Sequence, residues 1–279
     1  MSDTWGKEID LANLKKIELG ILRQIHAVCQ KEAIRYSLCG GTLLGAVRHG
    51  GFIPWYYDID IFMPRPDYNR FIAYCKENQT PFRLVSSETE PKYGYLFAKA
   101  VNPDTVIREI NGNRGRLPLG VSVDVFPIDG LGDTYEEAKK RFGKTRFKRE
   151  LLVAYNWKRF FRSKTHSFVY EPIRFAFFLL SRFANPLKLI GRIQAAYPPE
   201  DFEKSGYAGT VCGSYRLKEI LPKTVYSEFE MTDFEGERFC AIRDKETYLK
   251  SIYGDYMKLP PPEKRVTHHT FDAYYKASE

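Results

Sequence analysis

Two aspartates one residue apart constrain the fold of this chain most, because they stand in a run of otherwise apolar residues. The run is Asp58-Ile59-Asp60-Ile61-Phe62-Met63. Alternate side chains of a β-strand point to the same face, so the run predicts a strand with both carboxylates on one face and Ile59, Ile61 and Met63 in the core. Carboxylates held this close repel and raise each other's pKa unless a cation lies between them. The run therefore predicts a binding site for Mg²⁺ or Mn²⁺, which prefer oxygen ligands and in turn bind phosphates.

The composition narrows the class of protein and its expected location. Of the 279 residues, 43% are hydrophobic and 28% charged, which is ordinary for a soluble globular protein. No apolar run reaches the roughly 18 residues that a membrane span needs. Residues 1–10 are polar and lack the apolar core of a secretion signal. The five cysteines are odd in number and form no Cys-x-x-Cys pair, so neither a disulfide framework nor a zinc ribbon is supported. We therefore expect a cytoplasmic location.

The spacing of apolar residues and of turn-forming residues predicts the order of helices and strands. An amphipathic helix is expected over residues 10–33, a short strand over 35–39, a helix over 43–48 capped by Thr42, and a helix from 66 to about 78. Further strands are expected at 83–86, 95–101, 105–110 and 121–126, with a turn at Asp129-Gly130 and a helix at 245–253. In the strand at 121–126, Val121, Val123 and Val125 share one face and Asp124 lies on the other with Ser122 and Phe126.

Strands interspersed with helices over the first 130 residues predict an α+β or α/β fold, and we take α+β as the fold class. The pattern is mostly helical from about residue 134 to 196. We therefore divide the chain into a catalytic core (1–133), a basic, aromatic-rich helical insertion (134–196) and a C-terminal part that completes the site (197–279).

The chain's net charge of +8 is not spread evenly, because positive charge is concentrated in the helical insertion. Residues 144–192 contain twelve Lys or Arg and two acids, Glu150 and Glu171, interleaved with phenylalanines and leucines. Such a segment can face anionic lipid, a polyanionic glycan or nucleic acid. Alternatively, its apolar face is core and its basic face is simply solvated. Because no RNA-binding motif is present, we do not expect nucleic acid as a partner.

Three further features support the same interpretation as the paired aspartates: the Gly40-Gly41 turn, the helix start after it, and Asp124. Gly40-Gly41 permits close approach of a phosphate, and the backbone amides at the following helix start, with Thr42, offer it donors. Asp124, on its own strand, can supply a third carboxylate. Three carboxylates holding two metal ions, with donor phosphates between them, can activate an acceptor hydroxyl and stabilise a leaving group. We therefore predict that Asp58, Asp60 and Asp124 are both catalytic and metal-binding.

These residues resemble the LicD family of phosphocholine transferases. The resemblance rests on residues 39–56 (CGGTLLGAVRHGGFIPWY), 58–65 (DIDIFMPR) and 123–129 (VDVFPID), and residues 234–236, 253–257 and 259–265 resemble the family's C-terminal blocks. It covers nearly the whole chain, with residues 144–192 the least distinctive part. It implies a nucleotidyltransferase-like mixed-sheet core and transfer of a phospho-alcohol, above all phosphocholine, from a CDP-alcohol such as CDP-choline to a hydroxyl of a glycan. The acceptor would be a cell-surface glycan, a lipid-linked glycan or a teichoic-acid precursor, used at the cytoplasmic side. Possible peripheral membrane contact is a separate expectation, which comes from the basic segment 144–192. The carboxylates at Asp58, Asp60 and Asp124 would bind Mg²⁺, and one would act as base.

The chain departs from the family pattern just before the paired aspartates. The family has three consecutive aspartates after its tryptophan, whereas Trp55 is followed here by Tyr56, Tyr57 and only then Asp58. Tyr57 should share the face of Ile59, and Tyr56 should line the site, where it would remove negative charge. The change predicts an altered donor pocket, a weaker second metal or impaired activity.

Five arginine, lysine and histidine residues complete the candidate substrate-binding set: Arg48, His49, Lys99, Arg265 and His268. Arg48 and His49 are placed to meet donor phosphates, or they are a solvated helix end. Lys99 reaches a cleft or is exposed on an edge strand. Arg265 and His268 could fold back as a lid. A metal site at His268-His269 is not favoured.

Three other functions remain open at this stage. A nucleotide-sugar glycosyltransferase also uses Asp-x-Asp, a template-free RNA nucleotidyltransferase shares the Gly-Gly and acidic motifs, and a degenerate homologue would bind glycan or membrane without chemistry.

Overall fold

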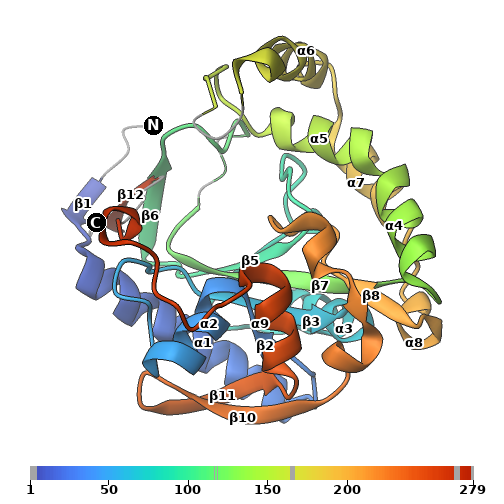
Figure 1. The fold of residues 1–279 in the computed structure, drawn as a ribbon. Helices are drawn as coiled ribbons and strands as arrows, with labels where there is room; N and C mark the ends of the chain where they lie inside the picture. The colour runs from blue at the N-terminus through green and yellow to red at the C-terminus, as the bar shows by residue number, and fades with distance from the viewer. Residues whose placement is uncertain (1–4, 116, 118, 164–166, 267–270, 278–279) are drawn as a thin grey trace.

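A mixed seven-stranded sheet carries the predicted acidic strands at its centre (Figure 1). The computed structural model describes residues 5–115, 117, 119–163, 167–266 and 271–277. The main path of the sheet runs β2 (Ser37–Leu38), β3 (Asp60–Pro64), β7 (Ser122–Gly132), β5 (Ala98–Val101) and β4 (Arg83–Val85), and β8 (Tyr207–Gly209) and β9 (Leu221–Pro222) continue from β7. β3 and β7 are parallel, and the other neighbours are antiparallel. The observed class is mixed α/β, in agreement with the predicted α+β class.

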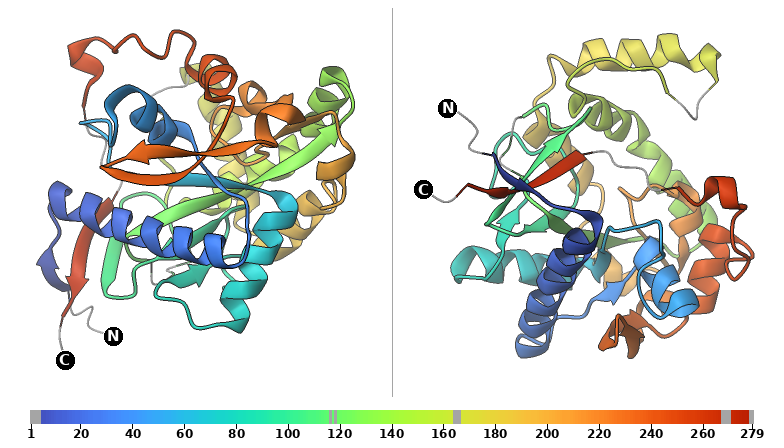
Figure 2. Two further views of the ribbon diagram at one scale, coloured as in Figure 1. Left: turned by 90° about the horizontal axis from the view of Figure 1, so that it is seen from below. Right: turned by 90° about the vertical axis from the view of Figure 1, so that its left-hand side faces the viewer.

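Helices α1 (Leu11–Lys31) and α3 (Arg65–Glu77) pack on this sheet. The Asp10 side chain caps α1 by accepting from the Asn13 amide at 2.8 Å. The apolar stripe of α1, including the fully buried Leu22 and Ile25, enters the main core, and α3 contributes Phe71. Figure 2 shows α1 running along the strands. These long helices hold β3 and β7 in place through apolar burial.

The remaining strands lie around the central sheet. β1 (Trp5–Glu8), β12 (Phe271–Lys276) and β6 (Thr105–Glu109) form a small antiparallel sheet that joins the two ends of the described chain. β10 (Phe229–Phe234) and β11 (Glu237–Ile242) form a hairpin, which α2 (Gly40–His49) contacts. α9 (Lys245–Tyr253) follows and also contacts α2.

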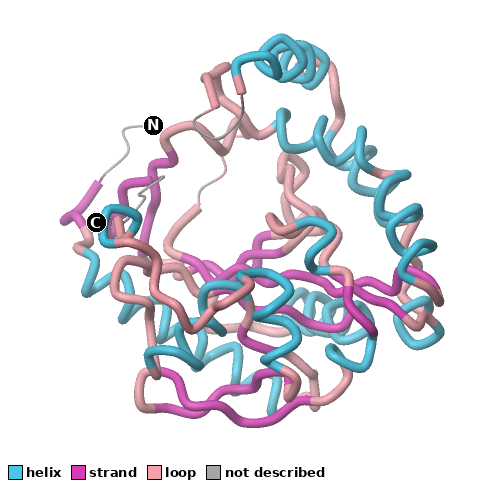
Figure 3. Tube along the Cα trace, viewed as in Figure 1, coloured by secondary structure: helices cyan, strands magenta, loops and turns pink. Residues whose placement is uncertain are grey.

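A group of helices packs against one end of the sheet through its first and last members and has its own apolar core (Figure 3). It consists of α4 (Tyr135–Lys144), α5 (Arg146–Tyr155), α6 (Glu171–Ser181) and α7 (Pro186–Gln194), followed by α8 (Asp201–Lys204). The residues that the structure describes also include four short 3₁₀ turns: η1 (Phe168–Tyr170), η2 (Arg216–Glu219), η3 (Lys223–Tyr226) and η4 (Pro262–Lys264). None of the helices in the described ranges combines the length and apolar character required to cross a bilayer.

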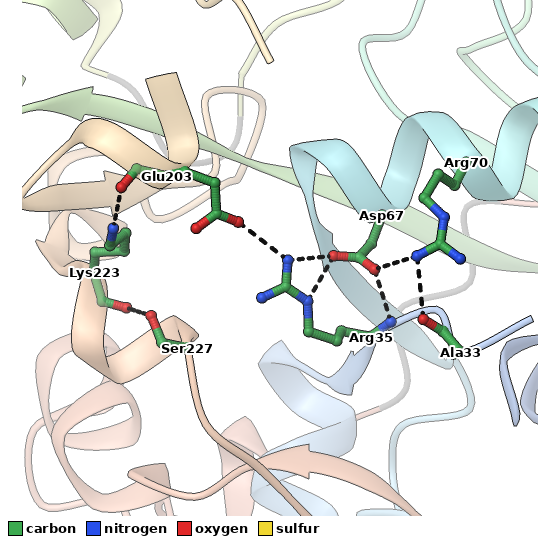
Figure 4. A network of polar contacts seen from close by, with 7 residues as sticks. All are labelled: Ala33, Arg35, Asp67, Arg70, Glu203, Lys223 and Ser227. Atoms are coloured by element: carbon green, nitrogen blue, oxygen red, sulfur yellow. Dashed lines mark hydrogen bonds and ion pairs between the residues drawn. The ribbon is translucent and has the colours of Figure 1, made fainter. Parts of the chain in front are cut away.

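A polar network ties the N-terminal and C-terminal parts together (Figure 4). The Arg35 Nε donates to Asp67 Oδ2 of α3 at 2.7 Å, and its Nη2 lies 3.3 Å from Glu203 Oε1 of α8. Lys223 then donates to the Glu203 carbonyl at 2.6 Å. Segments more than 150 residues apart in the sequence are therefore linked through Arg35.

Most predicted elements are present, and three local predictions are wrong. α2 begins at Gly40, so Thr42 lies inside the helix and does not cap it. β7 continues to Gly132, so Asp129 and Gly130 form no turn. Asp129 remains in the strand because the buried Arg65 guanidinium neutralises it, with Nε 2.6 Å from Oδ1. β3 begins at Asp60, which leaves Asp58 just outside the strand. The domain boundaries stay a prediction.

Candidate active site

The central strands place two carboxylates and a lysine side by side. Asp60 on β3 and Asp124 on β7 are paired residues in the parallel register, and Lys99 on β5 is paired with Asp124 from the other side. The Asp124 amide donates to the Ile59 carbonyl at 3.2 Å, so the backbone continues the pairing ahead of β3. The valine face of β7 is buried, as predicted, which directs Asp124 to the opposite face.

Thr42 fixes the backbone that carries the paired aspartates. Its hydroxyl accepts from the Asp60 amide at 2.9 Å and donates to the Asp58 carbonyl at 3.3 Å. The side chain is 3% exposed, so water cannot easily replace it. The Gly-Gly-Thr motif therefore orients the acidic segment directly.

All three predicted aspartates line one pocket of about 290 Å³. Its walls also include Glu18 of α1, Tyr57, Tyr95, Phe97, Lys99, Ser122 and, from the small sheet, Glu109 and Phe271. The predicted convergence of Asp58, Asp60 and Asp124 on one cleft is thus what the structure shows.

Negative charge in this pocket exceeds positive charge. Burial raises the pKa of the Asp60 carboxyl well above its usual value, and the charges of Asp58 and Asp124 raise it further. Burial also raises the pKa of Asp58, with Asp124 adding to the effect. The pKa of Glu18 is raised well above normal, first by burial and then by Asp58. A nearby cation therefore stabilises the ionised form of each of these carboxyl groups.

Lys99 is the one basic side chain among the described residues that line the pocket. Its Nζ lies 2.5 Å from Asp124 Oδ1 and 5.2 Å from the centre of the Phe97 ring. Burial alone would lower the pKa of Lys99, but the charge and hydrogen bond of Asp124 outweigh it and raise the pKa. β5 lies between β7 and β4, so the alternative of edge-strand exposure is wrong, because Lys99 reaches into the site.

The donor set fits a divalent cation that shares its coordination with a substrate. Within the described parts of the chain, no three Asp, Glu, His or Cys side chains are arranged to enclose a metal by themselves. Asp124 is paired with Lys99, while burial and the neighbouring carboxylates raise the pKa values of Asp58 and Asp60. Mg²⁺ commonly takes only one or two carboxylates, with substrate phosphates and water as its other ligands.

The start of α2 lies beside the Asp60 carboxyl. A Cβ added at Gly40, which has a φ of +52°, would lie 3.7 Å from Asp60 Oδ2. The Gly40 amide donates to the Tyr248 hydroxyl at 3.2 Å, and a Cβ at Gly41 would meet no atom within 4 Å. The positive end of the helix and open space at Gly41 thus adjoin the acidic pocket, an arrangement that suits a phosphate.

The other predicted basic residues gather outside the acidic pocket. Arg48 Nη1 donates to the Tyr256 carbonyl at 2.8 Å, and burial lowers the pKa of Arg48, with Arg265 also contributing. The Arg265 guanidinium lies 5.8 Å from the Trp55 ring, which the His49 ring contacts edge-on at 6.2 Å. This basic group at Trp55 joins α2 to the C-terminal segment, and its role in substrate binding stays a prediction. His268 and His269 lie outside the described residues.

Tyr56 and Tyr57, the two tyrosines before Asp58, have different positions. Tyr57 is 7% exposed, lines the pocket and contacts Phe271 edge-on at 5.6 Å. Tyr56 is 44% exposed and does not line the acidic pocket, so a role for it in the site stays a prediction. The segment before Asp60 is not a regular strand, which is why simple alternation fails there.

Glu18 is the main site residue that the sequence analysis missed. It is 2% exposed, and its carboxylate accepts from the Ile59 amide at 2.8 Å. The available signal was its position in the helix stripe, four residues after Leu14 and four before Leu22. A charged residue in an apolar stripe needs a polar partner.

A second, larger cleft of about 1130 Å³ shares Tyr95, Phe97 and Glu109 with the acidic pocket. Its remaining walls come from α5, from the segment between α5 and α6, from Arg174 and Phe177 of α6, and from residues 94–96, 110–112 and 211–216. Aromatic rings and arginines, including Trp157 and Arg162, line it. The acidic pocket therefore adjoins a space large enough for a small organic substrate.

Comparison with known proteins places this site in a family. Residues 33–169 match the family described as LicD/FKTN/FKRP, nucleotidyltransferase domain. The chain is 32% identical over 276 residues to the lipopolysaccharide cholinephosphotransferase LicD of Haemophilus influenzae, covering 96% of this chain and 99% of that protein. It is 51% identical over 82 residues to human ribitol 5-phosphate transferase FKRP, covering 29% of this chain and 15% of FKRP. An uncharacterised protein of Rickettsia prowazekii is 37% identical over 68 residues, covering 24% of this chain and 26% of that protein.

Proposed function

We propose that this chain, which belongs to the LicD family, is a phospho-alcohol transferase that uses a CDP-alcohol donor, with CDP-choline the first candidate. The observation that carries the proposal is the convergence of Asp58, Asp60, Asp124 and Lys99 in one pocket. Two relatives are named as transferases of phosphocholine and of ribitol 5-phosphate, which supports the phospho-alcohol class. The acceptor is a glycan hydroxyl on a cell-surface polysaccharide or teichoic-acid precursor, and the sheet around the site is nucleotidyltransferase-like.

In this reaction an acceptor hydroxyl oxygen attacks the phosphorus that bears the alcohol. The new P–O bond forms as the bond to CMP breaks, CMP leaves, and the hydroxyl proton passes to a carboxylate. Asp58 suits this role because its side chain is exposed and lines the pocket. Asp60, whose backbone Thr42 fixes, would hold the cation together with Asp58 and Asp124.

Mg²⁺ or Mn²⁺ bound there would neutralise charge on the donor phosphates and on the leaving CMP. Lys99 adds a fixed positive charge on the same side of the sheet, and it orients Asp124 through their contact. Phe97 and Tyr95 shield this pair from water on one side. The helix start at Gly40 and Gly41 offers amides to the diphosphate, and the large adjoining cleft has room for the rest of donor or acceptor.

The test is release of CMP when the full chain is incubated with Mg²⁺, a panel of glycan acceptors and the CDP-alcohols of choline, ethanolamine, glycerol and ribitol. Transfer with one of these donors, lost on adding EDTA and in Asp60→Asn, is the expected result. Absence of CMP with every donor contradicts the proposal. Turnover of a UDP- or GDP-sugar in the same panel would favour a glycosyltransferase instead.

A further inference from the structure

The outward face of α6 is apolar, which inverts the usual pattern of a surface helix. The exposed residues recur at spacings of three and four: Pro172, Ile173, Phe175, Ala176, Leu179, Leu180 and, just past the helix end, Phe183. Leu179, Leu180 and Phe183 are 48%, 53% and 92% exposed. This set, which we call the α6 face, contains no charged or hydrogen-bonding side chain. An exposed apolar patch of this kind marks a contact surface.

The polar residues of α6 point inward. Arg174 Nη1 lies 2.7 Å from Glu171 Oε2, and its guanidinium lies 4.8 Å from the Trp157 ring. Arg182, directly after the helix, donates to the Ala154 carbonyl at 2.8 Å. α6 is therefore anchored to α5 by its charged side and turns its apolar side away from the protein. Figures 1 and 2 show α6 at the periphery, far from the β10–β11 hairpin.

Exposed basic residues precede and follow the α6 face in the sequence. Lys158, Arg159 and Arg162 precede it, and Lys188 and Arg192 follow it, all with exposed side chains. The Arg162 guanidinium lies 5.4 Å from the ring of Phe168, which is itself 69% exposed. The segment's two acids do not offset this charge, because Glu171 is paired with Arg174 and Glu150 with Arg216.

We propose that the α6 face and its flanking cations dock the protein on an anionic lipid surface. An amphipathic helix with an apolar face and a basic border lies in the membrane interface, with its apolar side chains among the acyl chains and its cations at the headgroups. Charge selects lipid over a second copy of this chain, since two such basic surfaces would repel each other. The docking does not depend on the proposed function.

Docking in this orientation has a consequence that does rest on the proposed function. Phe161, Arg162 and Phe177 line the large cleft beside the acidic pocket, and they come from the same segment that carries the α6 face. A glycan acceptor carried on a lipid would then be presented at the mouth of that cleft.

Flotation of the full chain with vesicles tests the proposal. We expect the protein to float with phosphatidylcholine vesicles that contain phosphatidylglycerol, to float weakly with phosphatidylcholine alone, and to lose binding as salt is added. Leu179→Ser/Leu180→Ser/Phe183→Ser should lower the vesicle partition coefficient at least about tenfold. The matched control Leu217→Ser/Met257→Ser/Leu259→Ser, which removes three exposed apolar side chains elsewhere, should not.

A second pair of variants tests the charge and guards against misfolding of the first. Arg159→Glu/Arg162→Glu should lower partition to anionic vesicles at least about tenfold, whereas Lys16→Glu/Lys258→Glu, with the same change in net charge, should have a much smaller effect. The proposal is overturned if the parent does not float with anionic vesicles or if each control loses as much binding as its partner. It is also overturned if light scattering shows a dimer that the triple α6 variant dissociates. CMP release in detergent, measured separately, distinguishes failure of docking from failure of the proposed function.

Discussion

Replacement of Asp60 by Asn should stabilise the cation-free protein, although Asp60 lies at the centre of the proposed site. Burial and the charges of Asp58 and Asp124 raise the pKa of Asp60 well above normal. Ionisation of Asp60 therefore destabilises the folded state relative to the unfolded chain. At an effective dielectric constant of about 20, two like charges about 4 Å apart repel by about 4 kcal/mol. Lys99 and solvent offset part of this. We therefore expect Asp60→Asn to raise the free energy of unfolding by about 1–2 kcal/mol.

The matched control is Asp129→Asn, the same change at a buried aspartate of the same sheet. Asp129 is 1% exposed and accepts two hydrogen bonds from Arg65, at 2.6 and 3.0 Å. Removing its charge leaves the buried Arg65 guanidinium without an anionic partner, so a loss of about 3–5 kcal/mol is expected. The two substitutions should thus have opposite signs.

Urea unfolding at pH 7 in EDTA, followed by tryptophan fluorescence, measures both effects. The melting temperature should move with them, by about 2–4 °C per kcal/mol. If Asp60→Asn loses stability as Asp129→Asn does, the acidic pocket has no excess of negative charge and the reasoning is refuted.

Three further predictions concern the same region. Thr42→Val removes the acceptor of the Asp60 amide and should cost about 1–3 kcal/mol in urea unfolding while lowering the CMP-release rate; an unchanged rate would show that Thr42 does not position the aspartates. Lys99→Met should destabilise by about 3 kcal/mol in EDTA, opposite in sign to Asp60→Asn, because Asp124 loses its partner among other acids; equal stability would contradict the pairing. Burial raises the pKa of Glu219 from 4.5 to about 8, so between these pH values the folded state keeps a proton that the unfolded chain releases. The free energy of unfolding should therefore fall as pH rises from about 4.5 to about 8, by up to about 1.4 kcal/mol per pH unit. Glu219→Gln should lessen that fall when unfolding is compared at about pH 5 and about pH 8, and an identical pH dependence would exclude Glu219 as its source.

The central strands were predictable because their patterns depend on short-range alternation. Ile61 and Met63 on β3, and Val123 and Val125 on β7, are buried as expected. Parallel pairing of the two strands then places Asp60 opposite Asp124, which the sequence suggested through two separate acidic positions. Local pattern was sufficient wherever one face of an element is buried.

Partners supplied by distant segments were not predictable in this way. The local pair Asp129-Gly130 is typical of a turn. Its position in a strand depends on Arg65, which lies 64 positions earlier and which no local pattern reveals. Glu18 could be recognised as unusual in its helix, but nothing local shows that its partner is the Ile59 amide. The inward orientation of the charged side of α6 likewise depends on contacts with α5 that no periodicity reveals.

Binding of Mn²⁺ followed by electron paramagnetic resonance tests the central claim most directly. The parent and Asp129→Asn should both take up Mn²⁺ in competition with Mg²⁺, with tighter binding when a CDP-alcohol is present, and Asp60→Asn should lose this uptake. Equal Mn²⁺ binding by the parent and Asp60→Asn would contradict the assignment of the acidic pocket as the metal-dependent site.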